Sequence, residues 1–335
     1  MVLLNDLFGK NQDKTTQTNQ KHSTSKPSEK ISYHDDFIEI SSINFFGQYQ
    51  KSDSGEWVIC WSDSDPQQQT GGYRESGFGR YVLYNAKQEK IVLQGKLERP
   101  NSGYIANNGI FSIEDWHFGN DLSGTFYVFA ANGDELIKRK FEANIFNSSI
   151  SDGGRYAICQ TANNPESEDG NLLSAFDVEK NTELFSINPT TDWADSYDFI
   201  EDTPYFTVVI DEIGSFRYDK EGAFVDAEKY DAAQLCCDRF DTVLLTAEEI
   251  LKEPEPSRER VKLALEAILR ARSLGADENK YWKGIALKVQ GLAHELLDNK
   301  ERALEAFDEA LTINPKIGVK RKADSLRKML AKKDK

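Results

Sequence analysis

The chain of 335 residues has few of the side chains that usually carry chemistry. It contains four histidines and four cysteines, with no Cys-x-x-Cys pair of the kind found in zinc and redox sites. The His-Glu-x-x-His pattern of zinc proteases and the loop of an EF-hand are also absent. The glycine-rich residues 71–80 lack the Gly-Lys-Ser/Thr ending of a phosphate-binding loop. We therefore expect no catalytic residue, no cofactor and no metal, in a protein that is not an enzyme.

Long hydrophobic runs are missing as well. No window approaches the roughly 18 consecutive apolar residues that a transmembrane helix needs. The start, MVLLNDLFGK, has neither the basic beginning nor the small-residue cleavage site of a signal peptide. Cys60, Cys159, Cys236 and Cys237 are interpreted as reduced thiols. These features predict a cytoplasmic protein with no membrane partner.

Acidic residues outnumber basic ones by 56 to 41, and the excess is unevenly distributed. Residues 37–254 carry 38 acidic and 17 basic side chains, whereas residues 255–335 carry 13 acidic and 19 basic ones. The most basic piece, 316–335, has nine Lys and Arg residues. An acidic domain repels nucleic acid and attracts cationic surfaces. The charge pattern therefore predicts a protein partner with a basic surface and no nucleic acid.

The densest acidic group is predicted to lie in a loop that also holds Trp193 and Tyr197. It consists of Asp192, Asp195, Asp198, Glu201 and Asp202. Their spacing does not match a calcium-binding loop. Two interpretations remain open: a solvated turn, and a patch that binds basic side chains of a partner.

Residues 37–230 show short apolar and aromatic runs between polar turns, which is typical of strands. A polar turn followed by an aromatic-led strand recurs at 52–60, 106–113, 151–159 and 201–209. A hairpin recurs at 81–93, 126–138, 173–185 and 216–225, and its aromatics Tyr84, Phe129, Phe176 and Tyr218 are 45, 47 and 42 residues apart.

This pitch and the SDGGRYAIC turn resemble WD40-type and related propeller repeats, although the Trp-Asp and Gly-His pairs of WD40 proteins are absent. The resemblance implies an all-β propeller-like domain of about four blades, closed or open. A twisted β-sandwich with internal duplication is the alternative.

From Asp241 the apolar period changes from two to 3.6 residues, which indicates helices. A short helix is expected at 245–253 with Thr246 as its N-cap, followed by helices at 257–275, 277–297, 300–313 and 316–335.

Residues 284–315 resemble one tetratricopeptide repeat (TPR). The residues that match its small, large and terminating positions are Gly291, Ala303, Phe307, Ala310 and Pro315. This resemblance implies two antiparallel helices that serve protein interaction, with 316–335 as a basic capping helix.

The sequence thus predicts α+β in separate domains: a disordered tether at 1–36 with a short apolar motif, VLLNDLF, a β-propeller-like domain at 37–240, and a TPR-like helical domain at 241–335. Its expected function is that of a non-enzymatic adaptor or scaffold. The alternative is an immunity protein that neutralises a basic enzyme, such as a nuclease toxin, by occluding it. Partner identity and oligomeric state remain open.

Overall fold

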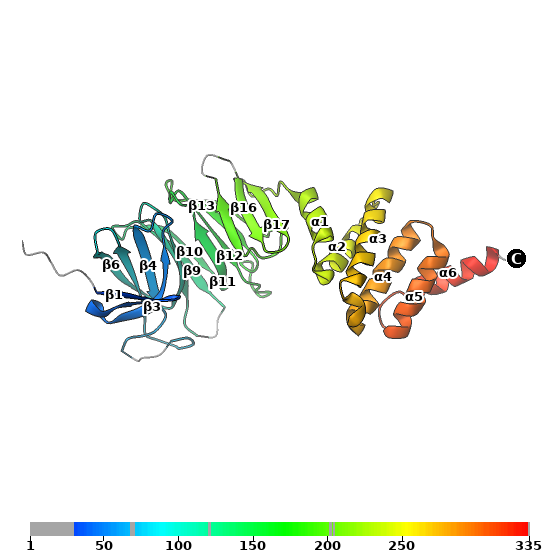
Figure 1. The fold of residues 1–335 in the computed structure, drawn as a ribbon, viewed down its shortest axis with the longest axis horizontal. Coiled ribbons are helices and arrows are strands. Elements are labelled where there is room, and N and C mark those ends of the chain that lie inside the picture. Colours follow the sequence, from blue (N-terminus) through cyan, green and yellow to red (C-terminus); the bar gives the residue numbers. More distant parts are fainter. Residues whose placement is uncertain (1–29, 68–70, 120–121, 201–202, 204, 334–335) are drawn as a thin grey trace, which may run out of the picture.

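The structure, a computed structural model, describes residues 30–67, 71–119, 122–200, 203 and 205–333. A β-rich N-terminal part of four antiparallel sheets precedes a C-terminal part of α-helices (Figure 1). The predicted fold class is confirmed: the sheets are open and follow one another as propeller-like blades. The VLLNDLF motif lies outside the described residues.

The β-strands of the described chain all precede its α-helices. Sheet 1 consists of β1 (Ile31–His34), β2 (Phe37–Ile40), β3 (Phe45–Lys51), β4 (Trp57–Ser62), β5 (Gly79–Asn85) and β6 (Lys90–Leu97). Sheet 2 consists of β7 (Pro100–Ile105), β8 (Phe111–Trp116), β9 (Gly124–Phe129) and β10 (Glu135–Phe141). Sheet 3 consists of β11 (Ile145–Ile150), β12 (Tyr156–Thr161), β13 (Leu173–Asp177) and β14 (Thr182–Ile187). Sheet 4 consists of β15 (Ser196–Phe199), β16 (Tyr205–Ile210) and β17 (Gly214–Asp219). The helices are α1 (Ala227–Cys236), α2 (Phe240–Lys252), α3 (Arg258–Ser273), α4 (Lys280–Leu296), α5 (Lys300–Ile313) and α6 (Lys320–Lys333).

The four-fold repeat in the sequence corresponds to equivalent strands. The recurring aromatics lie on β5, β9, β13 and β17, and all four are buried. The strands β3, β7, β11 and β15 begin the four repeated units, and each contacts the next one along the chain. Equivalent strands therefore lie side by side, as in neighbouring blades of a propeller.

The repeated polar turns have one geometry and are bonded to each other. In both SDSG and SDGG, the first serine accepts a hydrogen bond from the glycine N–H at 2.8 Å, and Gly55 and Gly154 have φ values of 68° and 76°. Glycine reaches this left-handed region at little cost. The Asn107 side-chain oxygen accepts from the N–H of Ser54, and the backbone N–H of Asn107 donates to the Asp152 carbonyl, so three successive turns are joined in a row.

Each pair of neighbouring sheets buries an apolar layer because successive strand residues point to opposite faces. Ile59 and Trp61 on β4 face sheet 2, whereas Val58 and Cys60 face away from it. That second face is covered by β2, whose Ile38 and Ile40 pack into the same cluster. Sheet 1 thus curls over its own outer face, and no further blade is needed there.

At the other end of the array, sheet 4 has a largely polar outer face. On β16, Phe206 and Val208 are buried against sheet 3, whereas Thr207 points to the opposite face together with the exposed Arg217 of β17. The edge of β17 is also occupied, because Arg217 forms an ion pair with Asp226 at 2.7 Å and Lys229 donates to the Ser215 carbonyl. A charged, occupied edge prevents the addition of another strand.

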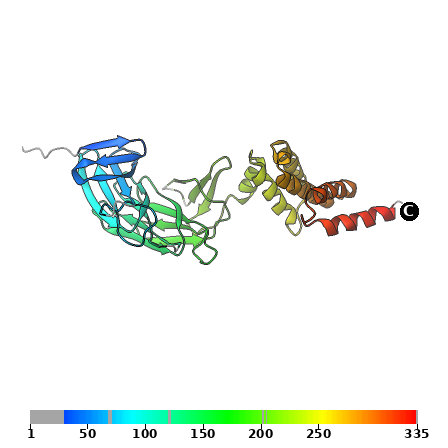
Figure 2. The same cartoon turned by 90° about the horizontal axis from the view of Figure 1, so that it is seen from below.

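The helices form antiparallel pairs that continue the long axis away from the sheets, with α6 at the far end (Figure 2). α4 and α5 pack closely because Gly291 leaves room for the Phe307 ring. A Cβ atom at Gly291 would lie 2.4 Å from two ring carbons. Phe307 is completely buried, with Ala303 and Ala310 also buried beside it on α5. Pro315 follows the end of α5.

Several boundaries differ from the sequence prediction. β1 lies inside the range predicted as a disordered tether, and α1 lies inside the range assigned to the β domain. The hairpin expected at 216–225 is reduced to one isolated bridge, between Tyr218 and Phe224. The predicted helix N-cap at Thr246 is wrong: α2 begins at Phe240, and Thr246 is buried within it. The apolar residues Val243 and Leu244 extend the helical pattern upstream of the expected start.

Replacing Phe307 by alanine should reduce the free energy of unfolding by about 3–5 kcal/mol, because a fully buried ring is removed from a site that Gly291 cannot refill. Chemical denaturation of the full chain measures this change. Leu296→Ala on the exposed side of α4 is the control and should cost less than about 0.5 kcal/mol. A similarly small loss for Phe307→Ala would contradict the packing of α4 on α5.

Candidate acidic groove

A groove of about 1290 Å³ lies where the last sheets meet the first helices. One wall is the 188–195 segment between β14 and β15, together with the β16–β17 turn. The other wall consists of residues on α1 and α2 and in their connection. The groove therefore joins segments that are up to about 100 residues apart in the chain, including Phe146 and Glu249.

Carboxylates dominate this groove. Its acidic lining residues are Asp192, Asp195, Asp211, Glu212, Asp231, Asp241 and Glu249, against one basic residue, Arg239. Arg239 is already engaged, since its hydrogen bond with Asp241, at 3.4 Å, raises the pKa of the guanidinium. Asp192, Asp195, Asp211, Glu212 and Glu249 are exposed to solvent. The groove thus presents a net negative charge that its own residues do not neutralise.

The 188–195 segment is held firmly by two tyrosines. The N–H of Thr191 donates to the Tyr218 hydroxyl, and the N–H of Asp192 donates to the Tyr230 hydroxyl, both at 3.0 Å. Burial raises the pKa of both phenols, so they remain protonated. Because Tyr218 is on β17 and Tyr230 on α1, these bonds also fix the helix against the sheet.

Apolar side chains lie among the carboxylates. The Phe146 and Trp193 rings pack at 4.7 Å between centroids, and each side chain remains 44% exposed. The indole N–H of Trp193 donates to the Asn171 side chain at 3.2 Å, which fixes the ring. Leu245 on the opposite wall is 51% exposed. Exposed apolar surface with a charged rim is typical of sites that bind another protein.

The groove contains only part of the acidic cluster predicted from the sequence. Asp192 and Asp195 line it, and the Asp195 carboxylate also accepts the N–H of Asp211 at 2.7 Å. Asp198 is exposed on β15 but is not among the lining residues, and Glu201 and Asp202 lie outside the described residues. No specific sequence pattern indicates the acidic groove residues on α1 and α2. Only the net charge of residues 37–254 indicated them.

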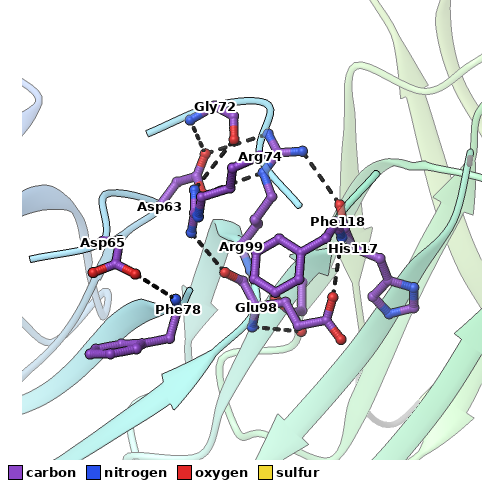
Figure 3. Close-up of polar contacts among 10 residues, drawn as sticks. Asp63, Asp65, Gly72, Arg74, Phe78, Glu98, Arg99, His117 and Phe118 are labelled. Carbon is purple, nitrogen blue, oxygen red and sulfur yellow. Dashed lines mark hydrogen bonds and ion pairs between the residues drawn. The ribbon is translucent and has the colours of Figure 1, made fainter. Parts of the chain in front are cut away.

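A second polar cluster joins Asp63, Asp65 and Arg74, which lie between β4 and β5, to sheet 2 (Figure 3). The buried Arg74 forms an ion pair with Asp63 at 2.7 Å and donates to the Glu98 carbonyl at 2.8 Å. Arg99 approaches the same Asp63 carboxylate at 3.4 Å. Asp65 accepts the N–H groups of Gln67 and Phe78. These charged groups hold the segment between β4 and β5 against sheet 2.

Two neighbouring residues on β8, Glu114 and Asp115, point to opposite faces of sheet 2. Asp115 accepts the Arg99 N–H at 2.7 Å on the side of sheet 1, whereas Glu114 accepts from Ser148 at 2.7 Å on the side of sheet 3. Burial raises the pKa of each to about 7, against the opposing effect of these hydrogen bonds. His117, two residues on, bonds through both ring nitrogens to the hydroxyls of Ser123 and Thr125.

Among the residues that the structure describes, no group of three or more His, Cys, Asp or Glu side chains could hold a metal ion. Within the same part of the chain, no helix has the length and apolar character needed to cross a bilayer. All four cysteines are free; Cys236 is exposed and the others are buried.

Comparison with known proteins gives no family for this chain. No family model matches it, and no curated protein matches it either. Solved structures with some similarity include a mitotic checkpoint complex (8% identity, TM-score 0.34, covering 57% of this chain and 60% of that one). Another is a complex of KlAtg21 with the coiled coil of AgAtg16 (10% identity, TM-score 0.37, covering 55% and 58%). The chain thus spans less than two thirds of each, and these scores assign it no function.

Replacing Glu114 by glutamine should stabilise the protein above pH 7 and have little effect below about pH 4.5. The folded protein holds the carboxyl proton up to a pKa of about 7, whereas the unfolded chain releases it near 4.5. Wild-type stability therefore falls as pH rises through this window, and glutamine removes this cost, which reaches roughly 3 kcal/mol. Denaturant unfolding at pH 4.5 and pH 8 measures the difference. Glu75→Gln, at an exposed carboxyl, is the control. Equal effects of Glu114→Gln at both pH values would contradict this burial.

Proposed function

We propose that this protein is a non-enzymatic scaffold that binds a basic segment of another protein in the acidic groove. The observation that carries the proposal is the composition of the groove. Seven carboxylates line it, and only two of them are paired among the described residues, Asp241 with Arg239 and Asp231 with Arg260. Charge complementarity of this kind accelerates association and selects partners by the sign of their charge.

The exposed apolar side chains of the groove, Phe146, Trp193 and Leu245, add affinity that charge alone does not provide. A Lys or Arg side chain placed over the exposed Trp193 ring would make a cation–π contact while pairing with a nearby carboxylate. The ring is already fixed by Phe146 and Asn171, so little conformational entropy is lost on binding. A segment that combines basic and apolar side chains fits this surface best.

The helical part is proposed to be a short TPR-like module. Its support is the α4–α5 pair, in which the Phe307 ring fills the space left by Gly291, with Ala303 and Ala310 buried on the same helix. α2, α3 and α4 pack in sequence around one apolar cluster. The module supplies the α1–α2 side of the groove and a second surface for assembly.

Reversing the charge of the groove should abolish binding of a basic probe. The probe is a fluorescent peptide of alternating Arg and Leu residues, and binding is measured by fluorescence anisotropy at low and high salt. We expect wild-type affinity to fall steeply with salt. The Asp192→Lys, Glu249→Lys protein should bind at least about tenfold more weakly, a loss of about 1.4 kcal/mol.

A matched control carries the same change in net charge outside the groove. Asp198→Lys with Glu166→Lys alters two exposed carboxylates that do not line it. We expect this variant to bind nearly as wild type does. Equal weakening in both double variants would show that the probe responds to overall charge, and the proposed site would be incorrect.

A further inference from the structure

The basic helix α6 has two faces with different roles. Ala323 and Leu326 on its inner face, with Val319 just before the helix, are buried in one cluster with Ala303 and Phe307 of α5. Two of its basic residues are paired there: Lys322 with Glu295 at 2.6 Å, and Arg327 with Asp308. These contacts fix α6 at the end of the helical part, so it does not reach the groove of its own chain (Figures 1 and 2).

The outer face of α6 carries three basic side chains that form no ion pair with any residue the structure describes. Arg321, Ser325, Lys328 and Lys332 are spaced by four, three and four residues, so they lie along one stripe, and all four are exposed. Among the described residues, Arg321, Lys328 and Lys332 form no ion pair, in contrast to Lys322 and Arg327. Met329, 51% exposed, adjoins this stripe.

The groove has the complementary properties. Asp192, Asp211, Glu212 and Glu249 also lack an ion pair with any described residue, and Leu245 and Trp193 are exposed between them. The same chain therefore carries two complementary surfaces. The outer face of α6 has exposed cations beside an apolar side chain, and the groove has exposed carboxylates beside apolar side chains.

We infer that the outer face of α6 of one copy docks in the acidic groove of a second copy. This inference rests on the proposed function of the groove as a site for basic segments. Because the two surfaces differ and lie at different positions along the molecule, the contact is head-to-tail and can repeat from copy to copy. A basic partner would compete with α6 for the groove, so partner binding would dissolve the assemblies.

The test is sedimentation velocity of the full chain over a range of concentrations, at about 50 mM and about 500 mM salt. Wild type should associate at low salt and dissociate at high salt. The α6 variant Arg321→Glu, Lys328→Glu and the groove variant Asp211→Lys, Glu249→Lys should each remain monomeric. Circular dichroism melting checks that both are folded.

Mixing the two variants provides the decisive result. The acidic α6 of one fits the basic groove of the other, and the unaltered surfaces also fit, so the mixture should associate although neither protein does alone. The control Arg258→Glu, Lys262→Glu, with the same change in charge at exposed positions on α3, should associate as wild type does.

A wild-type protein that stays monomeric at low salt, or an α6 variant that still associates, would overturn the inference. The Arg-Leu probe distinguishes this failure from failure of the proposed function. If wild type binds the probe in the groove yet remains monomeric, only the docking of α6 is incorrect. If assembly occurs, adding the probe should reduce it, and an unchanged sedimentation profile would contradict a shared site.

Discussion

Each β-sheet in this chain has two faces, and every apolar face must be covered by something. Within the array the covering layer is the next sheet, as Ile59 and Trp61 on β4 show by packing toward sheet 2. At the first end, β2 folds its isoleucines over Val58 and Cys60. At the last end, Thr207 and Arg217 make the outer face of sheet 4 largely polar, with the half-buried Tyr205 and Val209 beside them. Four sheets therefore suffice, and the array has no need to close into a ring.

The position of the groove follows from where this array stops. α1 packs on sheet 4, where Tyr230 joins the cluster of Phe206 and Phe216 and holds the N–H of Asp192. The helices then turn away along the long axis, which leaves the 188–195 segment and α2 as facing walls. Carboxylates are readily placed on such walls because they remain in water, where charge has a small solvation cost. The same position gives a partner access to apolar side chains that packing has left uncovered.

Much of the fold could be predicted because the relevant information is local. The continuous apolar run Val58–Trp61 after a polar turn predicts a strand, and the recurring aromatic marks the third strand of each repeated unit. The covering of the Val58 face could not be predicted, since Ile38 and Ile40 look like any other strand residues. α1 was missed because it buries only Tyr230 and has no apolar stripe.

The binding site was predictable only in part, for a related reason. The sequence predicts Asp192, Asp195 and Asp198 as one acidic cluster because they are close along the chain. The fold places Asp192 and Asp195 in the groove and Asp198 outside it. Asp211, Asp231 and Glu249 come together with them only through the packing of α1 on sheet 4, which is a long-range property. Phe307 and Gly291, by contrast, face each other across a two-helix unit whose spacing the sequence contains.

Hydrogen–deuterium exchange of the full chain, with and without the basic Arg-Leu peptide, tests the central claim most directly. The account predicts slower exchange in the 188–195 segment, the 210–213 turn and α2, because these form the walls that the peptide would cover. Exchange in β1–β6 should not change. Protection confined to sheet 1 or to α4–α6, with no change at the groove walls, would contradict the account.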